Sequence, residues 1–429
     1  MNASTNTGNA GVPAMAQQAR ELTRVGRAAE AALLWQRVLA ADLNNTEALL
    51  GLSIQALARR DAAAALQMLQ HAATTAPRDL MVHIYTAVAL KDLGRPDEEM
   101  AAVTRALTID PYFYPALLHQ GMLLERLGKR RQAARVFKDV LKIMPEPEQA
   151  GPKFRKAAEH AQAAIQENQQ SLERHLDTVL ADLRSRHSSA RLERFEETVK
   201  VATGAKKRYA PDPVMLHFAQ LPPLQFYDND LFPWIPELEA ATADIRRECE
   251  TVLAEQRNEF DPYIQYPPGA PVNQWQELNY SPRWTTYLLW KHGERVDAHC
   301  ERCPRTTALL ESLPLAYTPN FSPNVLFSAL EARTTIPPHT GDTNARLIVH
   351  LPLILPPKCT FRVGNDTREW QYGKAWVFDD SVEHEARNDS DELRVQLMFD
   401  VWNPSLTEAE RDLVGGLLNG MHEYYGAEG

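Results

Sequence analysis

A spacing of 34 residues between turn-forming positions constrains this chain more than any other feature. Gly26, Gly94 and Gly128 fall in step at that spacing, and Arg60 takes the place between the first two. A proline follows 17 residues after each of the last three positions, at Pro77, Pro111 and Pro145. A permissive residue lets a chain reverse tightly and a proline stops a helix, so the pattern predicts helix pairs.

Small and bulky residues repeat in the same step. Alanine recurs where neighbouring helices must approach closely, and a large apolar residue follows each turn by nine positions: Trp35, Leu69, Val103 and Phe137. The pattern is similar to the tetratricopeptide repeat, with about four units over residues 14–146. Four unrelated amphipathic helices are the alternative. Such repeats bind peptides or proteins, and the candidate groove residues are Tyr85, Tyr112, Tyr114, His119, Lys129 and Arg130.

The composition of the segments that flank the repeats predicts a disordered N-terminus and a helical linker. Residues 1–13 are polar and small, which predicts a disordered N-terminus. Residues 152–205 are rich in Ala, Glu, Gln, Leu and Arg, which predicts a helical linker, either one helix or two joined near Ser188 and Ser189. A coiled-coil dimerisation helix is the alternative, but sustained heptads are missing.

Charge and cysteine content exclude some classes of protein. A net charge of −10 argues against binding nucleic acid through its phosphates. Four scattered cysteines do not make a disulfide framework, and Cys300 and Cys303 have no second pair to complete a zinc site. The sequence contains neither a signal peptide nor an apolar stretch of transmembrane length, so we expect a cytoplasmic chain without membrane contact.

Short strands dominate residues 337–402. Arg346 to Ile354 and Leu393 to Trp402 are rich in Leu, Ile, Val and Phe, and shorter apolar runs with turn signals lie between them. This predicts a closed or double-sheet antiparallel barrel of the cupin or jelly-roll class. The fold class is therefore α+β and multidomain, with an all-α repeat superhelix, a helical linker and a C-terminal barrel over residues 211–410.

Two histidines in this region predict an iron site. A non-haem Fe(II) site usually holds its metal with two His and one carboxylate, and open positions remain for co-substrate and oxygen. His339 and His384 supply the histidines, but Gly341 stands two residues after His339, where the carboxylate belongs. Asp342 lies one residue after that position.

Several spaced motifs resemble the aspartyl/asparaginyl β-hydroxylase family. They are His339-Thr340-Gly341-x-Thr343-Asn344-x-Arg346-Leu347-x-x-His350, then Phe378-Asp379-Asp380-Ser381-x-Glu383-His384, then Arg394 and Asp400-Val401-Trp402-x-Pro404. That family belongs to the 2-oxoglutarate-dependent oxygenases, is built on a double-stranded β-helix, and has glycine in place of the carboxylate ligand.

The resemblance implies a role for each matched residue. His339 and His384 are the two Fe(II) ligands, and Arg394 binds the distal carboxylate of the co-substrate 2-oxoglutarate, beside Ser328 and near His350. A forked, permanent cation such as Arg394 also suits a buried carboxylate on physical grounds. Arg346 and Asp380 are the candidate substrate-binding residues. With O2, this predicts a 2-oxoglutarate-dependent dioxygenase.

Two departures from the family pattern concern the substrate. Ile348 stands where the family has a second arginine, and Leu326 stands where the animal enzymes have a lysine. We expect β-hydroxylation of Asp or Asn residues in a protein or peptide that the repeats recruit. One alternative is an oxygenase for a small molecule, a carrier-bound amino acid or a lipid-linked acyl group. The other is a non-catalytic repeat scaffold with a degenerate barrel.

Overall fold

The chain divides into two compact units, Met1–Ala205 and Lys206–Gly429. The structure is a computed structural model that describes residues 11–144 and 152–426. The expected disorder of residues 1–10 and the expected helix stop at Pro145 lie outside the described residues. The first helix begins at Val12, so the expectation of a disordered segment through residue 13 is wrong for residues 12 and 13.

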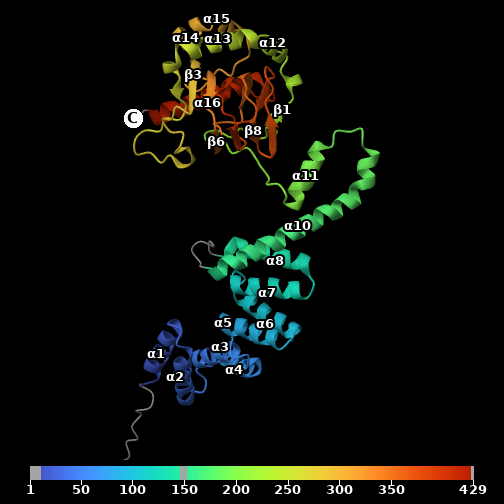
Figure 1. The fold of residues 1–429 in the computed structure, drawn as a ribbon, viewed down its shortest axis with the longest axis vertical. Helices are drawn as coiled ribbons and strands as arrows, with labels where there is room; N and C mark the ends of the chain where they lie inside the picture. The colour runs from blue at the N-terminus through green and yellow to red at the C-terminus, as the bar shows by residue number, and fades with distance from the viewer. Residues whose placement is uncertain (1–10, 145–151, 427–429) are drawn as a thin grey trace, which may run out of the picture. The chain divides into compact units, whose positions relative to one another are not determined.

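Eight helices of the first unit form four pairs in chain order (Figure 1). The first helices of successive pairs begin 34 residues apart, and so do the second helices. The pairs are α1 (Val12–Arg24) with α2 (Ala28–Ala41), α3 (Thr46–Ala58) with α4 (Ala62–Thr75), α5 (Leu80–Asp92) with α6 (Pro96–Ile109), and α7 (Tyr114–Arg126) with α8 (Arg130–Ile143). This region is built as tetratricopeptide repeats.

The turn inside each helix pair requires left-handed backbone. Gly26, Gly94 and Gly128 have φ angles of 79°, 70° and 73°, and Arg60 takes the same conformation at 63°. Glycine reaches this region without strain, while Arg60 does so at an energetic cost. The repeated alanines of the helices are fully buried, which allows the close helix approach that their spacing predicts.

One predicted groove residue is part of the internal packing of the repeats. His119 is hydrogen-bonded through Nε2 to the buried Glu99 at 2.6 Å, and Arg126 contacts both oxygens of the same carboxylate at 2.6 Å. Glu99 is 1% exposed, so its charge needs these partners. His119 is therefore a structural residue that holds α6 to α7.

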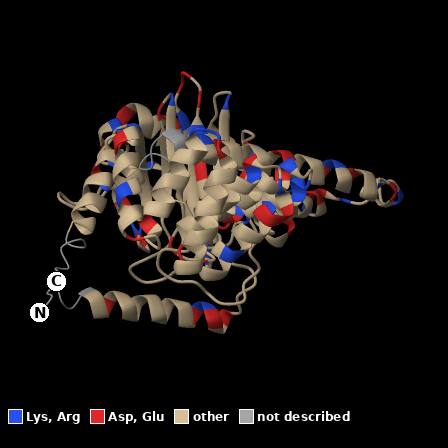
Figure 2. Cartoon of the chain, turned by 90° about the horizontal axis from the view of Figure 1, so that it is seen from below, with Lys and Arg blue, Asp and Glu red and all other residues tan. Residues whose placement is uncertain are grey.

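Two further helices follow within the described residues of the first unit. Helix α10 (Pro152–Arg186) packs on α8, where Ala161 lies against Phe137 and Val140. Helix α11 (Glu193–Thr203) returns along α10, and Arg184 holds Glu196 with two hydrogen bonds of 2.6 and 2.7 Å. Lys and Arg are interspersed with Asp and Glu over the chain (Figure 2), as these pairs require.

Two antiparallel sheets form the second unit. The larger sheet has the strand order β1-β10-β7-β12-β5-β3-β2, with β4 beside β3, and the smaller has the order β6-β11-β8-β9. The strands are β1 (Phe226–Tyr227), β2 (Asp261–Pro262), β3 (Trp284–Lys291), β4 (Glu294–Arg295), β5 (Val325–Leu330), β6 (Thr334–His339), β7 (Arg346–Ile354), β8 (Cys359–Val363), β9 (Asp366–Glu369), β10 (Trp376–Phe378), β11 (His384–Asn388) and β12 (Arg394–Trp402). The α+β multidomain fold class is confirmed.

Helices cover one face of the larger sheet (Figure 1). They are α12 (Ile235–Ala240), α13 (Thr242–Glu255), α14 (Asp297–Arg302) and α15 (Pro304–Ser312), and α16 (Glu408–Gly426) follows the last strand. Single turns lie between β1 and α12 (η1, Asn229–Leu231), between α13 and β2 (η2, Arg257–Glu259) and between β2 and β3 (η3, Asn273–Trp275). Helices α12 and α13 are separated by a break at Ala241.

Alternation along β7 directs its side chains to two different layers. Leu347, Val349 and Leu351 join the core beneath the helices. Arg346, Ile348 and His350 point the other way, because successive side chains of a strand face opposite sides. Ile348 packs there among residues of the smaller sheet, so this inner layer lies between the two sheets. The predicted functional residues of β7 therefore face the interior.

Candidate active site

The two predicted metal ligands lie side by side. His339 ends β6, His384 begins β11, and the antiparallel register of these strands pairs the two residues directly. The centroids of their imidazole rings are 4.0 Å apart. Two segments separated by 45 positions in the sequence thus place both rings at one point at the rim of the smaller sheet.

Backbone hydrogen bonds orient both imidazoles. His339 Nδ1 lies 2.8 Å from the Pro337 carbonyl oxygen, and His384 Nδ1 lies 3.0 Å from that of Val382. A carbonyl oxygen only accepts, so each Nδ1 carries the proton and each Nε2 keeps its electron pair. Burial lowers the pKa of His339 to about 4 and that of His384 well below its usual range. Both rings are therefore neutral near pH 7, as metal ligands must be.

Gly341 leaves room for another residue's carboxylate. A Cβ built on Gly341 would collide with the side chain of Asp380, whose backbone oxygen accepts a hydrogen bond of 2.7 Å from Gly341 N. Asp380 is 8% exposed, and its Oδ1 has no hydrogen-bond partner among the described residues. Burial raises the pKa of this carboxyl well above its usual range.

The chain supplies two nitrogen ligands at this point. The part of the chain that the structure describes contains no group of three or more His, Cys, Asp or Glu residues that could hold a metal ion. The two oriented, neutral imidazoles fit an ion that completes its coordination with oxygen atoms of a co-substrate and with water. A fully protein-coordinated structural ion does not fit here.

A buried arginine without a partner lies nearby. Arg394 begins β12, is 1% exposed, and its Nε, Nη1 and Nη2 have no hydrogen-bond partner among the described residues. Its guanidinium carbon stands 4.7 Å from the centre of the Trp370 ring. Burial lowers the pKa of Arg394 to about 10. A buried cation with unmet donors is unstable unless an anion joins it, so this position fits a bound carboxylate.

Further polar groups line the interior beside Arg394. Ser328 on β5 faces Gln396 on β12 in the strand register, and its Oγ accepts a hydrogen bond of 3.0 Å from Trp284 Nε1. Gln396 Nε2 donates to His350 Nδ1 at 3.3 Å, which places the imidazole proton on His350 Nε2. That N–H is buried without a partner in the described chain, as is Gln396 Oε1. These groups remain available to a ligand.

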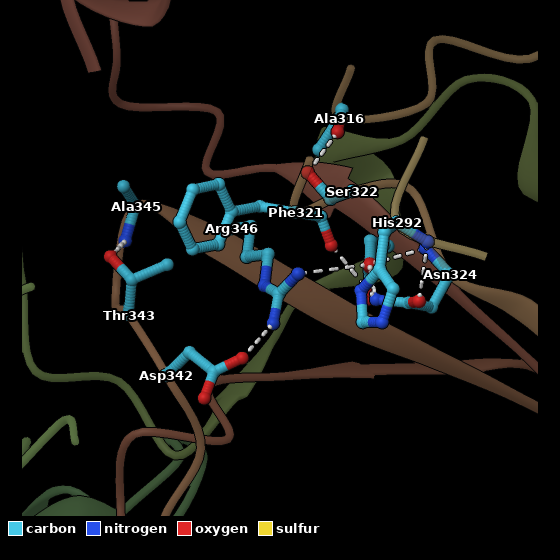
Figure 3. Close-up of polar contacts among 10 residues, drawn as sticks. His292, Ala316, Phe321, Ser322, Asn324, Asp342, Thr343, Ala345 and Arg346 are labelled. Atoms are coloured by element: carbon cyan, nitrogen blue, oxygen red, sulfur yellow. Dashed lines mark hydrogen bonds and ion pairs between the residues drawn. The ribbon is translucent and has the colours of Figure 1, made fainter. Parts of the chain in front are cut away.

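The second buried arginine of the interior holds two carboxylates through its Nη atoms (Figure 3), while its Nε has no hydrogen-bond partner among the described residues. Arg346 Nη1 lies 3.1 Å from Asp400 Oδ2, and its Nη2 lies 2.7 Å from Asp342 Oδ2. Asp400 also accepts a hydrogen bond of 2.7 Å from Asn324 N. Burial opposes the charge of Arg346, but the carboxylates of Asp400, Asp380 and Asp342 outweigh it and raise its pKa.

The sequence of the second unit matches a known family. Residues 239–404 correspond to the family described as Aspartyl/Asparaginyl beta-hydroxylase. This part of the chain is a domain of that family. The resemblance seen in the sequence is thereby confirmed, and the domain holds both histidines and both buried arginines.

Curated relatives share the β-hydroxylase domain. The chain is 32% identical to the human aspartyl/asparaginyl beta-hydroxylase over 180 residues, which cover 42% of this chain and 24% of that protein. It is 34% identical to the ornithine lipid ester-linked acyl 2-hydroxylase of Rhizobium tropici over 192 residues, which cover 44% of this chain and 64% of that protein. The chain thus spans about a quarter of the first and less than two thirds of the second.

Solved structures of repeat proteins resemble the other unit. A thermophilic TPR protein of Thermus thermophilus matches with a TM-score of 0.32 and 21% identity, over 42% of this chain and 97% of that one.

None of the helices within the described residues is long and apolar enough to cross a membrane.

The structure brings most of the predicted site residues of the β-hydroxylase domain into its interior. His350, Ser328 and Arg394 gather in one region, while Arg346 is tied to two carboxylates. Sequence reasoning did not identify Trp370, Gln396 and Asp400 as parts of these clusters. Gln396 and Asp400 had a signal, because they lie two and six residues after Arg394 on one strand and so share its face.

Proposed function

We propose that this chain is an Fe(II)- and 2-oxoglutarate-dependent dioxygenase. The observation that carries the proposal is the buried Arg394 guanidinium, which lies in the same interior as the paired His339 and His384. Its three nitrogens have no hydrogen-bond partner among the residues that the structure describes. Iron and 2-oxoglutarate, when bound, supply the oxidising chemistry that inserts one atom of O2 into a C–H bond and releases succinate and CO2.

The chain's own residues hold and orient the reactants. His339 and His384 present Nε2 electron pairs to the metal, because their Nδ1 atoms are fixed by backbone carbonyls. Arg394 pairs with the distal carboxylate of 2-oxoglutarate, with Ser328 beside it. The free N–H of His350 is a further donor to the co-substrate.

Aromatic side chains shield the reaction from water. The Trp275 ring lies 4.9 Å from the ring of His339 and 6.1 Å from that of Trp284, and both tryptophans are buried. A dry, apolar wall beside the metal strengthens the electrostatic hold on the co-substrate and limits side reactions.

The substrate class follows from the family and from the repeats. Membership of the β-hydroxylase family supports hydroxylation at the β-carbon of an Asp or Asn residue, and the tetratricopeptide repeats support its recruitment as part of a protein or peptide. The reaction would take place in the cytoplasm.

A second candidate function has an observation in its favour. Arg346, the remaining arginine for an acidic substrate, already pairs with Asp342 and Asp400. One relative, the Rhizobium tropici protein, is named as a hydroxylase of a lipid-linked acyl group. The second candidate is therefore hydroxylation of a lipid-linked acyl chain or of a small amino-acid derivative.

The test is anaerobic reconstitution of the full chain with Fe(II) and 2-oxoglutarate, followed by admission of oxygen and measurement of succinate. We expect succinate from the unmodified chain and none above background from His384→Ala. His422→Ala, an exposed histidine on α16, is the matched control and should behave as the unmodified chain. Failure of both iron and 2-oxoglutarate to bind would refute the proposal.

A further inference from the structure

The end of the interior at Arg346 carries more negative than positive charge. Two carboxylates, those of Asp342 and Asp400, pair with the single guanidinium of Arg346. Both of its Nη atoms are occupied, by Asp342 and by Asp400. A substrate carboxylate at this point would be a third anion around one cation, and like charges in a partly buried site repel strongly.

Asp342 is the accessible member of this group. Its side chain is 49% exposed, whereas that of Asp400 is 4% exposed. Its backbone oxygen is held by the N–H groups of Met215 and Leu216, both at 3.0 Å, so its position on the loop after His339 is fixed. Oδ2 meets Arg346, and Oδ1 has no hydrogen-bond partner among the described residues (Figure 3).

The subsite adjoins the reacting centre. Asp342 is three residues after His339, and the intervening Gly341 packs against Asp380. The side chain of Asp380 is more than nine-tenths buried, and its Oδ1 has no hydrogen-bond partner within the described ranges. A group held at Asp342 is therefore close to the metal position.

Aromatic rings add to this preference for positive charge. Tyr263 is 44% exposed, and its ring centroid lies 4.3 Å from that of Trp284. Its hydroxyl pKa is raised, first by burial and then by the negative charge of Asp342. Carboxylates beside an aromatic face bind cations well.

We propose that Asp342 makes this end of the site a receptor for a positively charged substrate group, an ammonium or a guanidinium. Arg346 then serves to position Asp342 and Asp400 and does not hold a substrate carboxylate. The inference rests on the proposed oxygenase function and narrows its substrate class. It is compatible with a basic residue next to the hydroxylated position of a peptide, or with a small molecule that carries an amine.

Three probes with equal side-chain length test the charge preference directly. They are the Nα-acetyl methylamides of ornithine, norleucine and 2-aminoadipate, whose side chains carry an ammonium, a methyl or a carboxylate after three methylenes. Their dissociation constants are measured by calorimetry on the full chain, on Asp342→Asn and on Asp244→Asn. Asp244 also pairs with two arginines, but on α13 away from the site, and is the matched control.

For the unmodified chain and for Asp244→Asn we expect the ornithine probe to bind about tenfold more tightly than norleucine, and 2-aminoadipate to bind most weakly. Asp342→Asn should abolish the preference for ornithine and improve binding of 2-aminoadipate, because Arg346 Nη2 loses its carboxylate. Asp342→Ala should give the same order, which guards against an effect peculiar to the amide.

Three outcomes would overturn the inference: tightest binding of 2-aminoadipate by the unmodified chain, an unchanged ornithine preference in Asp342→Asn, or no binding of any probe at tens of millimolar. Titration of 2-oxoglutarate into the same samples reports separately on Arg394. Loss of that binding would contradict the oxygenase function, whereas intact 2-oxoglutarate binding with the wrong probe order would contradict only the cationic subsite.

Discussion

Arg394 and Arg346 are both buried in the interior between the two sheets, yet their surroundings are opposite. Arg394 is 1% exposed and has no hydrogen-bond partner in the described chain, while Arg346 is 8% exposed and holds two carboxylates. A buried charge that the chain satisfies is part of the fold, and one that it leaves unsatisfied is a place for a ligand. The comparison distinguishes a structural arginine from a ligand-binding one, although both lie in motifs of the same family.

Removing the paired arginine should have the largest effect on folding. Arg346→Met leaves the buried Asp400 without its cation, so we expect the free energy of unfolding to fall by about 4 kcal/mol. Chemical denaturation measures this loss, with the exposed Arg247→Met as control. Adding Asp400→Leu to Arg346→Met should recover much of the stability. A stable single variant would mean that Arg346 is not a structural residue.

Removing Arg394 should weaken ligand binding without lowering the stability of the fold. Arg394→Met eliminates a buried charge without a partner, so the ligand-free protein should be as stable as before or more stable. Its affinity for 2-oxoglutarate should fall by about 100-fold or more. Thermal unfolding with and without 2-oxoglutarate checks both statements, and the exposed Arg387→Met serves as control. Unchanged affinity would remove Arg394 from the binding site.

Asp379 extends the comparison to an acid that also lacks a full set of partners. Ser381 donates to its Oδ1, but Oδ2 is buried without a hydrogen-bond partner in the described part of the chain, and burial raises the pKa of this carboxyl to about 6. The folded state thus keeps a proton that the unfolded chain releases near pH 4. This contribution to stability is complete below about pH 4 and is lost as the pH rises through about 6.

Asp379→Asn should therefore flatten the decline in stability between pH 4 and 6 by about 2 kcal/mol. The measurement is urea denaturation across that range, for the variant and for the unmodified chain. Parallel pH profiles for the two proteins would show that Asp379 ionises normally in the folded state.

The smallest effect concerns the ring beneath Arg394. Trp370→Phe keeps an aromatic ring but weakens the attraction for the guanidinium 4.7 Å away, so we expect 2-oxoglutarate affinity to fall about fivefold. Trp376→Phe is the matched control, because the Trp376 ring stacks on that of Trp370 and not on Arg394. Equal affinities in both variants would exclude a positioning role for Trp370.

The repeat architecture could be predicted from sequence because its determinants are local. The turn residues at Gly26, Gly94 and Gly128 and the buried alanines act within one helix pair, and the period adds their signals together. The break between α12 and α13 at Ala241 cannot be predicted in this way, because neither glycine nor proline marks it. Thr242 Oγ1 donates to the Glu239 carbonyl at 2.7 Å, which competes with the helical hydrogen bonds there.

The candidate site was predicted only in part, for a related reason. His339, His384 and Arg394 lie in recognisable motifs, but the state of each arginine depends on strand pairing. Asp400 reaches Arg346 through the register of β7 and β12, although 54 residues separate the two in the chain. Sequence spacing alone does not specify such a register, so the pairing of Arg346 with Asp400 became visible only in the fold.

The close fit of Gly341 against Asp380 also limits how this site can evolve. A single substitution of Gly341 to Asp would not restore a three-residue metal triad, because the new side chain would enter the volume that Asp380 already fills. A lineage that returned to the triad would need a smaller residue at position 380 first, and that step would remove a carboxylate that acts on Arg346. The two-histidine site is therefore separated from the commoner one by at least two coupled changes.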